Sequence, residues 1–286
     1  MQRTTQQERA EAFHRLHAGD KPLVLVNAWD AASARLFEQA GAPAIATTSA
    51  GIAWSLGYSD GEQMDTRELI QACARICRVV TAPVSVDIER GFGRTPTEVC
   101  ETVRALLELG VVGINIEDGV APGAKELVQP SVLAEKISAI RAVAEEVGVR
   151  LFINARTDTY FVSTVEGDDP VARYDETAQR ARIYVEAGAD GIFVPGLESL
   201  EEMERMARET PQPLNIYAGY AGLPPVAALG RAGVRRVSLG CGPFQAALAL
   251  ARRVATEALN EGTYTTMTAS MLSAGEMNNL FTVSEK

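Results

Sequence analysis

A repeated pattern of apolar and polar positions runs through the chain. In each copy an amphipathic stretch ends on Gly, which follows Ala in three copies and Leu in one, and a short apolar run follows that ends on a polar residue or Gly. The four copies are residues 36–49, 106–118, 184–196 and 229–240. A helix closed by a left-handed Gly and followed by a strand buried on both faces is typical of parallel α/β folds. We therefore predict a parallel α/β architecture, whose chemistry gathers at the carboxyl ends of its strands.

Eight strands and intervening helices can be counted from the same pattern. The predicted strands are 23–29, 44–49, 84–89, 113–118, 151–157, 191–196, 214–218 and 236–240. Apolar residues at helical spacing predict helices at 31–39, 67–80, 97–109, 132–147, 171–186, 200–209, 225–231 and 248–259. Eight strands that are each followed by a helix predict a closed (β/α)₈ barrel. An open dinucleotide-binding sheet is disfavoured because no Gly-x-Gly-x-x-Gly follows the first strand.

The length and the absence of a linker predict one domain. The 286 residues are close to the roughly 250 that such a barrel needs, and no Pro-, Gly- or Ser-rich stretch divides them. We assign residues 1–286 to a single barrel domain, with an N-terminal helix at 1–20 and a helical tail at 262–286. The segment 264–281 is apolar enough to favour packing on a neighbouring subunit, so we expect a homo-oligomer, a dimer of dimers. The alternatives are that this tail folds back on its own barrel or is disordered.

The composition of the chain indicates which classes of partner it can bind. The net charge of −10 and the pI near 4.9 argue against nucleic acid and anionic membranes, and no apolar run reaches the ~18 residues of a membrane span. The four cysteines form no disulfide or zinc pattern, which is typical of a reducing cytoplasm. We expect a cytoplasmic protein that acts on a small molecule.

Carboxylates gather at the ends of two predicted strands. Asp87 and Glu89 close the third strand, and Glu117 and Asp118 close the fourth. Such a cluster repels itself unless a cation or shared protons lie between its members. Oxygen ligands favour Mg²⁺, or alternatively Mn²⁺, over zinc. The alternative is that these side chains cap helices or pair with arginine.

A guanidinium is predicted at the same mouth. Arg156 closes the fifth strand, where its fork suits a carboxylate or phosphate. Its alternative role is a structural ion pair with Glu117 or Asp87. The two histidines of the chain, His14 and His17, precede the first strand, so serine hydrolase triads and histidine-bound metals are excluded from the barrel mouth.

With these residues located, the chain resembles the isocitrate lyase/phosphoenolpyruvate mutase superfamily. The most specific match is DIERGFG at 87–93, which is similar to the family's Asp-x-Asp/Glu-x-Gly-Tyr/Phe-Gly. The other similar segments are VNAWDAASA at 26–34, TTSAG at 47–51, GYSD at 57–60, IED at 116–118 and NARTD at 154–158. All six occur in the expected order and lie on predicted strand ends or in the loops beside them.

The resemblance implies a Mg²⁺-dependent barrel, often a helix-swapped tetramer, that breaks a C–C or P–C bond beside a 2-oxo or 2-hydroxy acid through an enolpyruvate-like species. It implies Asp87 as the chief metal ligand, with Asp60, Glu89 and Glu117 holding metal-bound waters. The implied substrate contacts are Trp29, Thr48, Ser49, Ala50, Asp87 and Arg156, and the implied catalytic residues are Asp60, Glu117 and Arg156.

Departures from the family's patterns select among its activities. Isocitrate and methylisocitrate lyases carry a Lys-Lys-Cys-Gly-His loop after the fourth strand, whereas residues 119–127 contain neither Cys nor His. Phosphoenolpyruvate mutases carry Lys and Asn in that loop and a His near strand six, where this chain has Val194-Pro195-Gly196. The chain is therefore closer to oxaloacetate decarboxylase-like and 2-oxo-acid-binding members. We expect a C–C lyase, with P–C chemistry or non-catalytic binding of a 2-oxo acid as alternatives, and Lys125 as either a gate or a surface lysine.

Overall fold

The computed structural model describes residues 5–119, 127–162, 169–219 and 222–282. Its nine strand segments form one parallel sheet in the order β1-β9-β8-β7-β6-β5-β4-β3-β2. The segments are β1 Leu23–Leu25, β2 Asn27–Ala28, β3 Ile45–Thr47, β4 Val84–Asp87, β5 Gly113–Glu117, β6 Phe152–Arg156, β7 Gly191–Phe193, β8 Leu214–Tyr217 and β9 Val234–Ser238.

The sheet closes into a barrel because the two halves of one predicted strand form its two edges. The predicted strand 23–29 is divided at Val26 into β1, which pairs with β9, and β2, which pairs with β3. Counting β1 and β2 as one position leaves the eight positions of a (β/α)₈ barrel, so the predicted fold class is confirmed. Several strands are shorter than predicted at their carboxyl ends, because those residues leave the ladder to form the mouth of the barrel.

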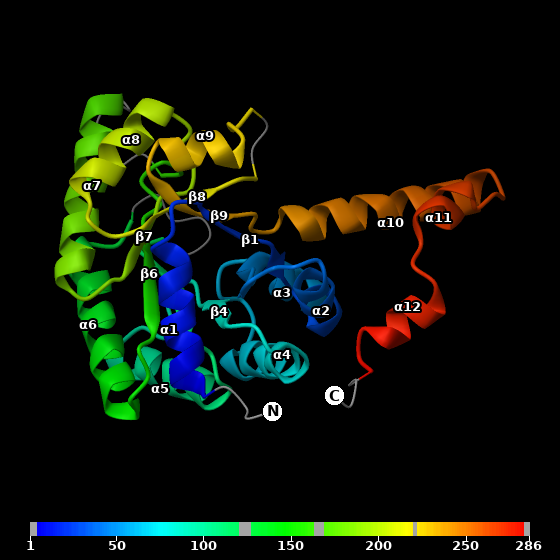
Figure 1. Cartoon of the computed structure of the whole chain (residues 1–286), viewed down its shortest axis with the longest axis horizontal. Helices are drawn as coiled ribbons and strands as arrows, with labels where there is room; N and C mark the ends of the chain where they lie inside the picture. Colours follow the sequence, from blue (N-terminus) through cyan, green and yellow to red (C-terminus); the bar gives the residue numbers. More distant parts are fainter. Residues whose placement is uncertain (1–4, 120–126, 163–168, 220–221, 283–286) are drawn as a thin grey trace.

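Twelve helices are described, most of them around the barrel (Figure 1). They are α1 Gln6–His17, α2 Ala31–Gln39, α3 Ser49–Leu56, α4 Thr66–Val79, α5 Pro96–Glu108, α6 Pro130–Val147, α7 Pro170–Glu186, α8 Leu200–Glu209, α9 Val226–Arg231, α10 Gly242–Asn260, α11 Thr265–Ser270 and α12 Ala274–Asn279. Among the helices in these ranges, none combines the length and the apolar character that crossing a membrane requires.

The glycine turns predicted from the repeat are confirmed. Gly41, Gly110, Gly188 and Gly233 have φ angles of 97°, 86°, 111° and 88°. Each follows a helix and stands in the left-handed region, which glycine enters without a Cβ penalty. The repeat in the sequence therefore marks four helix-to-strand turns of the barrel.

The histidines lie at the end of the barrel away from the strand carboxyl ends. His17 stacks on Phe152, the first residue of β6, with ring centroids 4.0 Å apart, and Phe13 packs on the same ring at 5.5 Å. Burial lowers the pKa of His17 to about 3, so this imidazole is neutral. The helix α1 therefore packs against the starts of the strands, and the mouth at their carboxyl ends is formed by other residues.

The apolar core lies between the sheet and its helices, and the barrel interior holds a polar layer. Asn115 and Asn154 are register partners on β5 and β6, and the Asn154 amide donates to Asn115 Oδ1 over 2.9 Å. From β9, the buried Arg236 reaches the same oxygen over 3.0 Å. Since side chains alternate along a strand, the intervening Ile114 and Ile153 face the helices and are fully buried.

An arm formed by α10, α11 and α12 projects from the barrel (Figure 1). Phe244 is the buried residue of α10, while Leu248 and Leu259 are 54% and 84% exposed. The far end of the arm returns to the same chain, because the Leu280 carbonyl accepts from Arg35 Nε of α2 over 2.7 Å.

Candidate active site

Neighbouring strands place the predicted residues side by side. Asp87 ends β4, Glu117 ends β5 and Arg156 ends β6, and Glu117 and Arg156 are register partners. Parallel strands bring these three ends to one edge of the sheet. Asp118 does not join them: it is fully buried and binds Arg180 of α7. The expectation that both carboxylates of this strand face the mouth is wrong, because consecutive residues point to opposite faces.

The four predicted metal residues form one electrostatic cluster. Burial is the largest effect on each, and it raises the pKa of Asp87 and Asp60 and raises the pKa of Glu117 well above its ordinary value. Repulsion from Asp60 further raises the pKa of Asp87. Repulsion from Asp87 and Glu89 does the same for the pKa of Glu117. Arg156 opposes these shifts at Asp87, Asp60 and Glu117. Asp60 lies at the exposed rim, whereas Glu89 is buried. When all four are ionised, these carboxylates carry more negative charge than the nearby guanidinium balances.

The Asp87–Phe92 turn is strained where it enters the cluster. Glu89 and Phe92 have φ angles of 50° and 52°, a region that side chains other than glycine rarely occupy. The turn is held by the Glu89 amide, which donates to Asp87 Oδ1 over 3.2 Å, and by the Glu89 carbonyl, which accepts from the Glu117 amide over 2.8 Å. Glu89 Oε1 is buried without a hydrogen-bond partner. Such strain and an orphaned buried oxygen are typical of functional sites.

These residues fit a divalent cation in one particular way. Across the described ranges, no three carboxylate, histidine or cysteine side chains stand close enough to form a ready-made ligand set. Mg²⁺ usually takes one or two carboxylates and keeps several waters. One direct ligand at Asp87, with Asp60, Glu89 and Glu117 around its water shell, matches this arrangement, and the orphaned Glu89 oxygen provides an acceptor for such a water.

The Arg156 guanidinium is fixed by two carboxylates. Its Nε and Nη2 donate to Asp158 over 2.6 and 3.0 Å, and its Nη1 lies 2.9 Å from Glu117 Oε2. Phe161 and Phe193 also lie beside it, with ring centroids 5.8 and 5.7 Å away. Among the described residues these ion pairs use three of the five N–H donors. The ion pair with Glu117, predicted as the alternative role of Arg156, is present. The remaining N–H donors can still bind an anion, so the structural role and the substrate-binding role are compatible.

The segment 47–51, which carries the predicted substrate contacts Thr48, Ser49 and Ala50, runs from the end of β3 into the first turn of α3. Thr48 caps this helix, since its Oγ1 accepts from the Gly51 amide over 3.3 Å, and Ser49 Oγ donates to Asp87 Oδ2 over 3.3 Å. The backbone N–H groups of Ser49 and Ala50 belong to this first turn, where a helix has no partners of its own for them. The helix itself was not predicted, because its residues are mostly apolar and lack a polar face.

Trp29 lies at the edge of this region. Its ring packs edge-to-face on Phe244 of α10 and Phe37 of α2, with centroids 5.2 and 6.1 Å apart. These contacts place it among apolar side chains, so its substrate contact stays a prediction. The Lys125 gate also stays a prediction, because residues 120–126 lie outside the described part of the chain.

Two groups at the site were not predicted from the sequence. Asp158 holds Arg156, although only its motif had been noticed. Arg236 lies buried in the layer below Asp87, and its Nη1 has no hydrogen-bond partner. Burial lowers the pKa of Arg236 to about 9, and the nearby Asp87 opposes that shift. The position of a charged residue at the start of the predicted strand 236–240 is the signal that could have identified Arg236.

The raised pKa of Glu89 predicts a pH-dependent stability. Burial, then repulsion from Asp60 and Asp87, raises the pKa of Glu89 from 4.5 to about 8. Between these values the folded chain binds more protons than the unfolded chain, so the free energy of unfolding falls as pH rises through this window. We expect Glu89→Gln to remove part of that fall, about 1.4 kcal/mol for each pH unit in the window.

Urea unfolding in EDTA at pH 5.5 and pH 8 measures this difference. Glu101→Gln, a change at an exposed site on α5, is the matched control and should follow the wild type. Equal pH dependence in Glu89→Gln and the wild type would show that Glu89 titrates normally.

Comparison with known proteins shows that the chain is similar to members of one family. The family profile described as phosphoenolpyruvate phosphomutase matches residues 13–259. An uncharacterized protein of Mycobacterium tuberculosis is 39% identical over 88% of this chain and 90% of its own length. A 2-methylisocitrate lyase of Aeropyrum pernix is 33% identical over 84% of this chain and 77% of its own length. Oxaloacetate decarboxylase 1 of Pseudomonas fluorescens is 28% identical, with coverage of 100% and 96%.

Solved structures share the fold. The crystal structure of a putative lyase/mutase from Burkholderia cenocepacia is similar with a TM-score of 0.88, 33% identity and 97% coverage of both chains. A phosphonopyruvate hydrolase solved with oxalate and Mg²⁺ has a TM-score of 0.82 over 95% of this chain and 94% of its own. At 22% identity the second likeness concerns the fold alone.

Proposed function

Since this chain belongs to the phosphoenolpyruvate phosphomutase family, within the isocitrate lyase/phosphoenolpyruvate mutase superfamily, we propose that it uses Mg²⁺ to cleave or decarboxylate a small 2-oxo or 2-hydroxy acid. The enzyme class is that of a carbon–carbon lyase. The named relatives act on different acids, so the identity of the acid is left to experiment.

One observation carries the proposal. A mutually repelling set of carboxylates, most of them buried or half-buried, lies beside a guanidinium that Glu117 of this set and Asp158 hold in place. A cation at Asp87 would balance the negative charge of the carboxylates. An anionic substrate would then bind both this cation and the Arg156 guanidinium. A site with these two charges side by side is suited to a 2-oxo acid, whose carboxylate and keto oxygen are adjacent.

The residues divide the work as follows. Asp87 would hold Mg²⁺ directly, with Asp60, Glu89 and Glu117 around its water shell, and the cation would supply positive charge where negative charge develops on the substrate. Arg156 binds and orients the substrate carboxylate, and Glu117 keeps the guanidinium in position. The N–H groups of Ser49 and Ala50 donate to substrate oxygens from a helix end that needs no reorganisation. Asp60 would exchange a proton with solvent, a role that its exposure supports.

Turnover followed by NMR tests the proposal. Oxaloacetate, 2-methylisocitrate and phosphonopyruvate are each incubated with the chain and Mg²⁺, and product signals are compared with those of an EDTA-treated sample. We expect the signals of oxaloacetate or 2-methylisocitrate to be replaced by product signals in the presence of Mg²⁺ and not in EDTA. Cleavage of phosphonopyruvate alone would assign P–C chemistry, and binding without turnover of any acid would assign a binding protein.

We also propose that the arm joins subunits. Leu248, Leu259 and Met271 are 54%, 84% and 62% exposed, which is a large apolar surface for a chain in water. Packing against another copy of the chain would cover this surface, so we infer a homo-oligomer, a dimer of dimers. Neither nucleic acid nor a membrane is part of the proposed assembly.

Light scattering of the full chain and of a chain that ends at Glu261 measures the contribution of α11 and α12. The full chain is expected to have a mass several times 30.6 kDa, and the shortened chain a lower one. A monomer in both cases would contradict the assembly, and an exposed control change, Arg104→Lys on α5, should leave the mass unchanged.

A further inference from the structure

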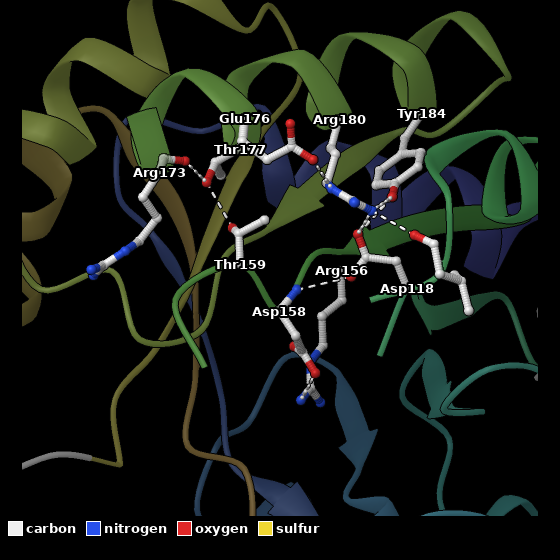
Figure 2. A network of polar contacts seen from close by, with 10 residues as sticks. Asp118, Arg156, Asp158, Thr159, Arg173, Glu176, Thr177, Arg180 and Tyr184 are labelled. Atoms are coloured by element: carbon white, nitrogen blue, oxygen red, sulfur yellow. Dashed lines mark hydrogen bonds and ion pairs between the residues drawn. The ribbon is translucent and has the colours of Figure 1, made fainter. Parts of the chain in front are cut away.

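A buried polar network lies beside Arg156 (Figure 2). Asp118 is its centre, since Oδ2 accepts from the Tyr184 hydroxyl over 2.6 Å and from Arg180 Nη1 over 3.1 Å. Tyr184 and Asp118 are fully buried and Arg180 is 4% exposed. None of the three is assigned a role by the chemistry proposed above.

The other oxygen of Asp118 leads to the site. Oδ1 accepts from the backbone N–H of Asp158 over 3.0 Å, and the Asp118 amide donates to the Arg156 carbonyl over 3.2 Å. Asp118 therefore holds both ends of the tripeptide Arg156-Thr157-Asp158. The Asp158 carboxylate at the end of this tripeptide receives two N–H groups of the Arg156 guanidinium.

Helix α7 fixes the same loop at a second point. Thr159 Oγ1 and Thr177 Oγ1 are 2.7 Å apart, and the Thr177 hydroxyl also donates to the Arg173 carbonyl over 2.7 Å (Figure 2). From this helix Arg180 also donates to the Val128 carbonyl over 2.8 Å. The loop that carries Asp158 is thus tied to α7 and to the end of β5.

We propose that Asp118, held by Tyr184 and Arg180, is a positioning residue that sets the Arg156 guanidinium through the Asp158 backbone. The role rests on the proposed function, in which Arg156 binds the substrate carboxylate. A buried network with every member bonded holds its groups in one arrangement. Loosening Asp118 lets the Asp158 carboxylate shift, and the fork of Arg156 then turns away from the anion.

Tyr184→Phe tests this with oxalate as the probe. The change removes one hydrogen bond to Asp118 and leaves its charge paired with Arg180. In the presence of Mg²⁺ we expect oxalate to bind roughly five- to tenfold more weakly, the effect of one hydrogen bond, with Mg²⁺ affinity unchanged. Tyr174→Phe is the matched control, because Tyr174 is a buried tyrosine of the same helix whose hydroxyl donates to Glu209 over 3.1 Å.

A double mutant separates positioning from general weakening. If Tyr184 acts through Arg156, adding Tyr184→Phe to Arg156→Lys costs little further oxalate affinity, whereas independent effects would add. Wild-type oxalate affinity in Tyr184→Phe, additivity in the double mutant, or an equal loss in Tyr174→Phe would overturn the proposal.

Hydrogen exchange at the Asp158 amide gives a readout that needs no ligand. We expect faster exchange in the peptide that contains Asp158 in Tyr184→Phe and not in Tyr174→Phe. Failure of the wild type to bind oxalate would contradict the proposed function alone, and unchanged exchange would contradict the positioning role.

Discussion

Asp87→Asn is expected to abolish Mg²⁺ binding and turnover while the chain stays folded. Asp87 ends β4 within the carboxylate cluster and accepts from Ser49 and from the Glu89 amide. Ser49 donates to Oδ2 and the Glu89 amide to Oδ1, so asparagine keeps an acceptor for one of these two bonds. It also removes one charge from a cluster that repels itself, which offsets the lost bond, so the free energy of unfolding should change little. Loss of the anionic ligand should weaken Mg²⁺ by at least about 100-fold.

Calorimetric titration with Mg²⁺ measures the affinity, and thermal unfolding measures the fold. Asp20→Asn is the control, since Asp20 is exposed and precedes β1 at the other end of the barrel. The same Mg²⁺ affinity in Asp87→Asn and the wild type would place the cation elsewhere, and unfolding of the variant would show that Asp87 is structural.

Arg156→Lys is expected to weaken oxalate while Mg²⁺ still binds. Lysine keeps the charge but loses the fork that meets Asp158, Glu117 and a bound carboxylate together. The loss should be about 1.5–3 kcal/mol, the scale of a hydrogen bond between charged groups, or roughly 10- to 150-fold in Kd. Kd values for oxalate at saturating Mg²⁺ give this difference.

Arg104→Lys is the matched control, because Arg104 pairs with Glu146 over 2.5 Å on the exposed surface. Its oxalate Kd should equal that of the wild type. If Arg156→Lys also binds oxalate as the wild type does, Arg156 serves the ion pairs with Glu117 and Asp158 and not the substrate.

Features encoded within a few residues could be predicted from the sequence. The chain turns at Gly110 and Gly188, where the repeat predicted it. Asp87, Glu117 and Arg156 lie at the carboxyl ends of their strands, which stop one or two residues before the predicted ends. Each follows from a local rule, the helix-ending glycine or the end of an apolar run. The meeting of the three side chains then follows from the parallel sheet.

Features that depend on closure of the barrel could not be predicted. Arg180 reaches Asp118 across 62 positions, and Arg236 reaches Asn115 across 121. No local pattern encodes such a pair, because the sheet order and the packing of α7 decide which side chains meet. The prediction that Asp118 lies at the mouth was wrong for a different, local reason, because consecutive residues of a strand point to opposite faces and Asp118 follows Glu117.

Titration of oxalate into the chain with saturating Mg²⁺ and again in EDTA tests the central claim most directly. The carboxylate cluster alone should repel oxalate, and Mg²⁺ beside Arg156 should attract it. We predict binding in Mg²⁺ that is lost in EDTA. Equal binding in both conditions, or none in Mg²⁺, would contradict a magnesium-dependent oxyacid site at the mouth of this barrel.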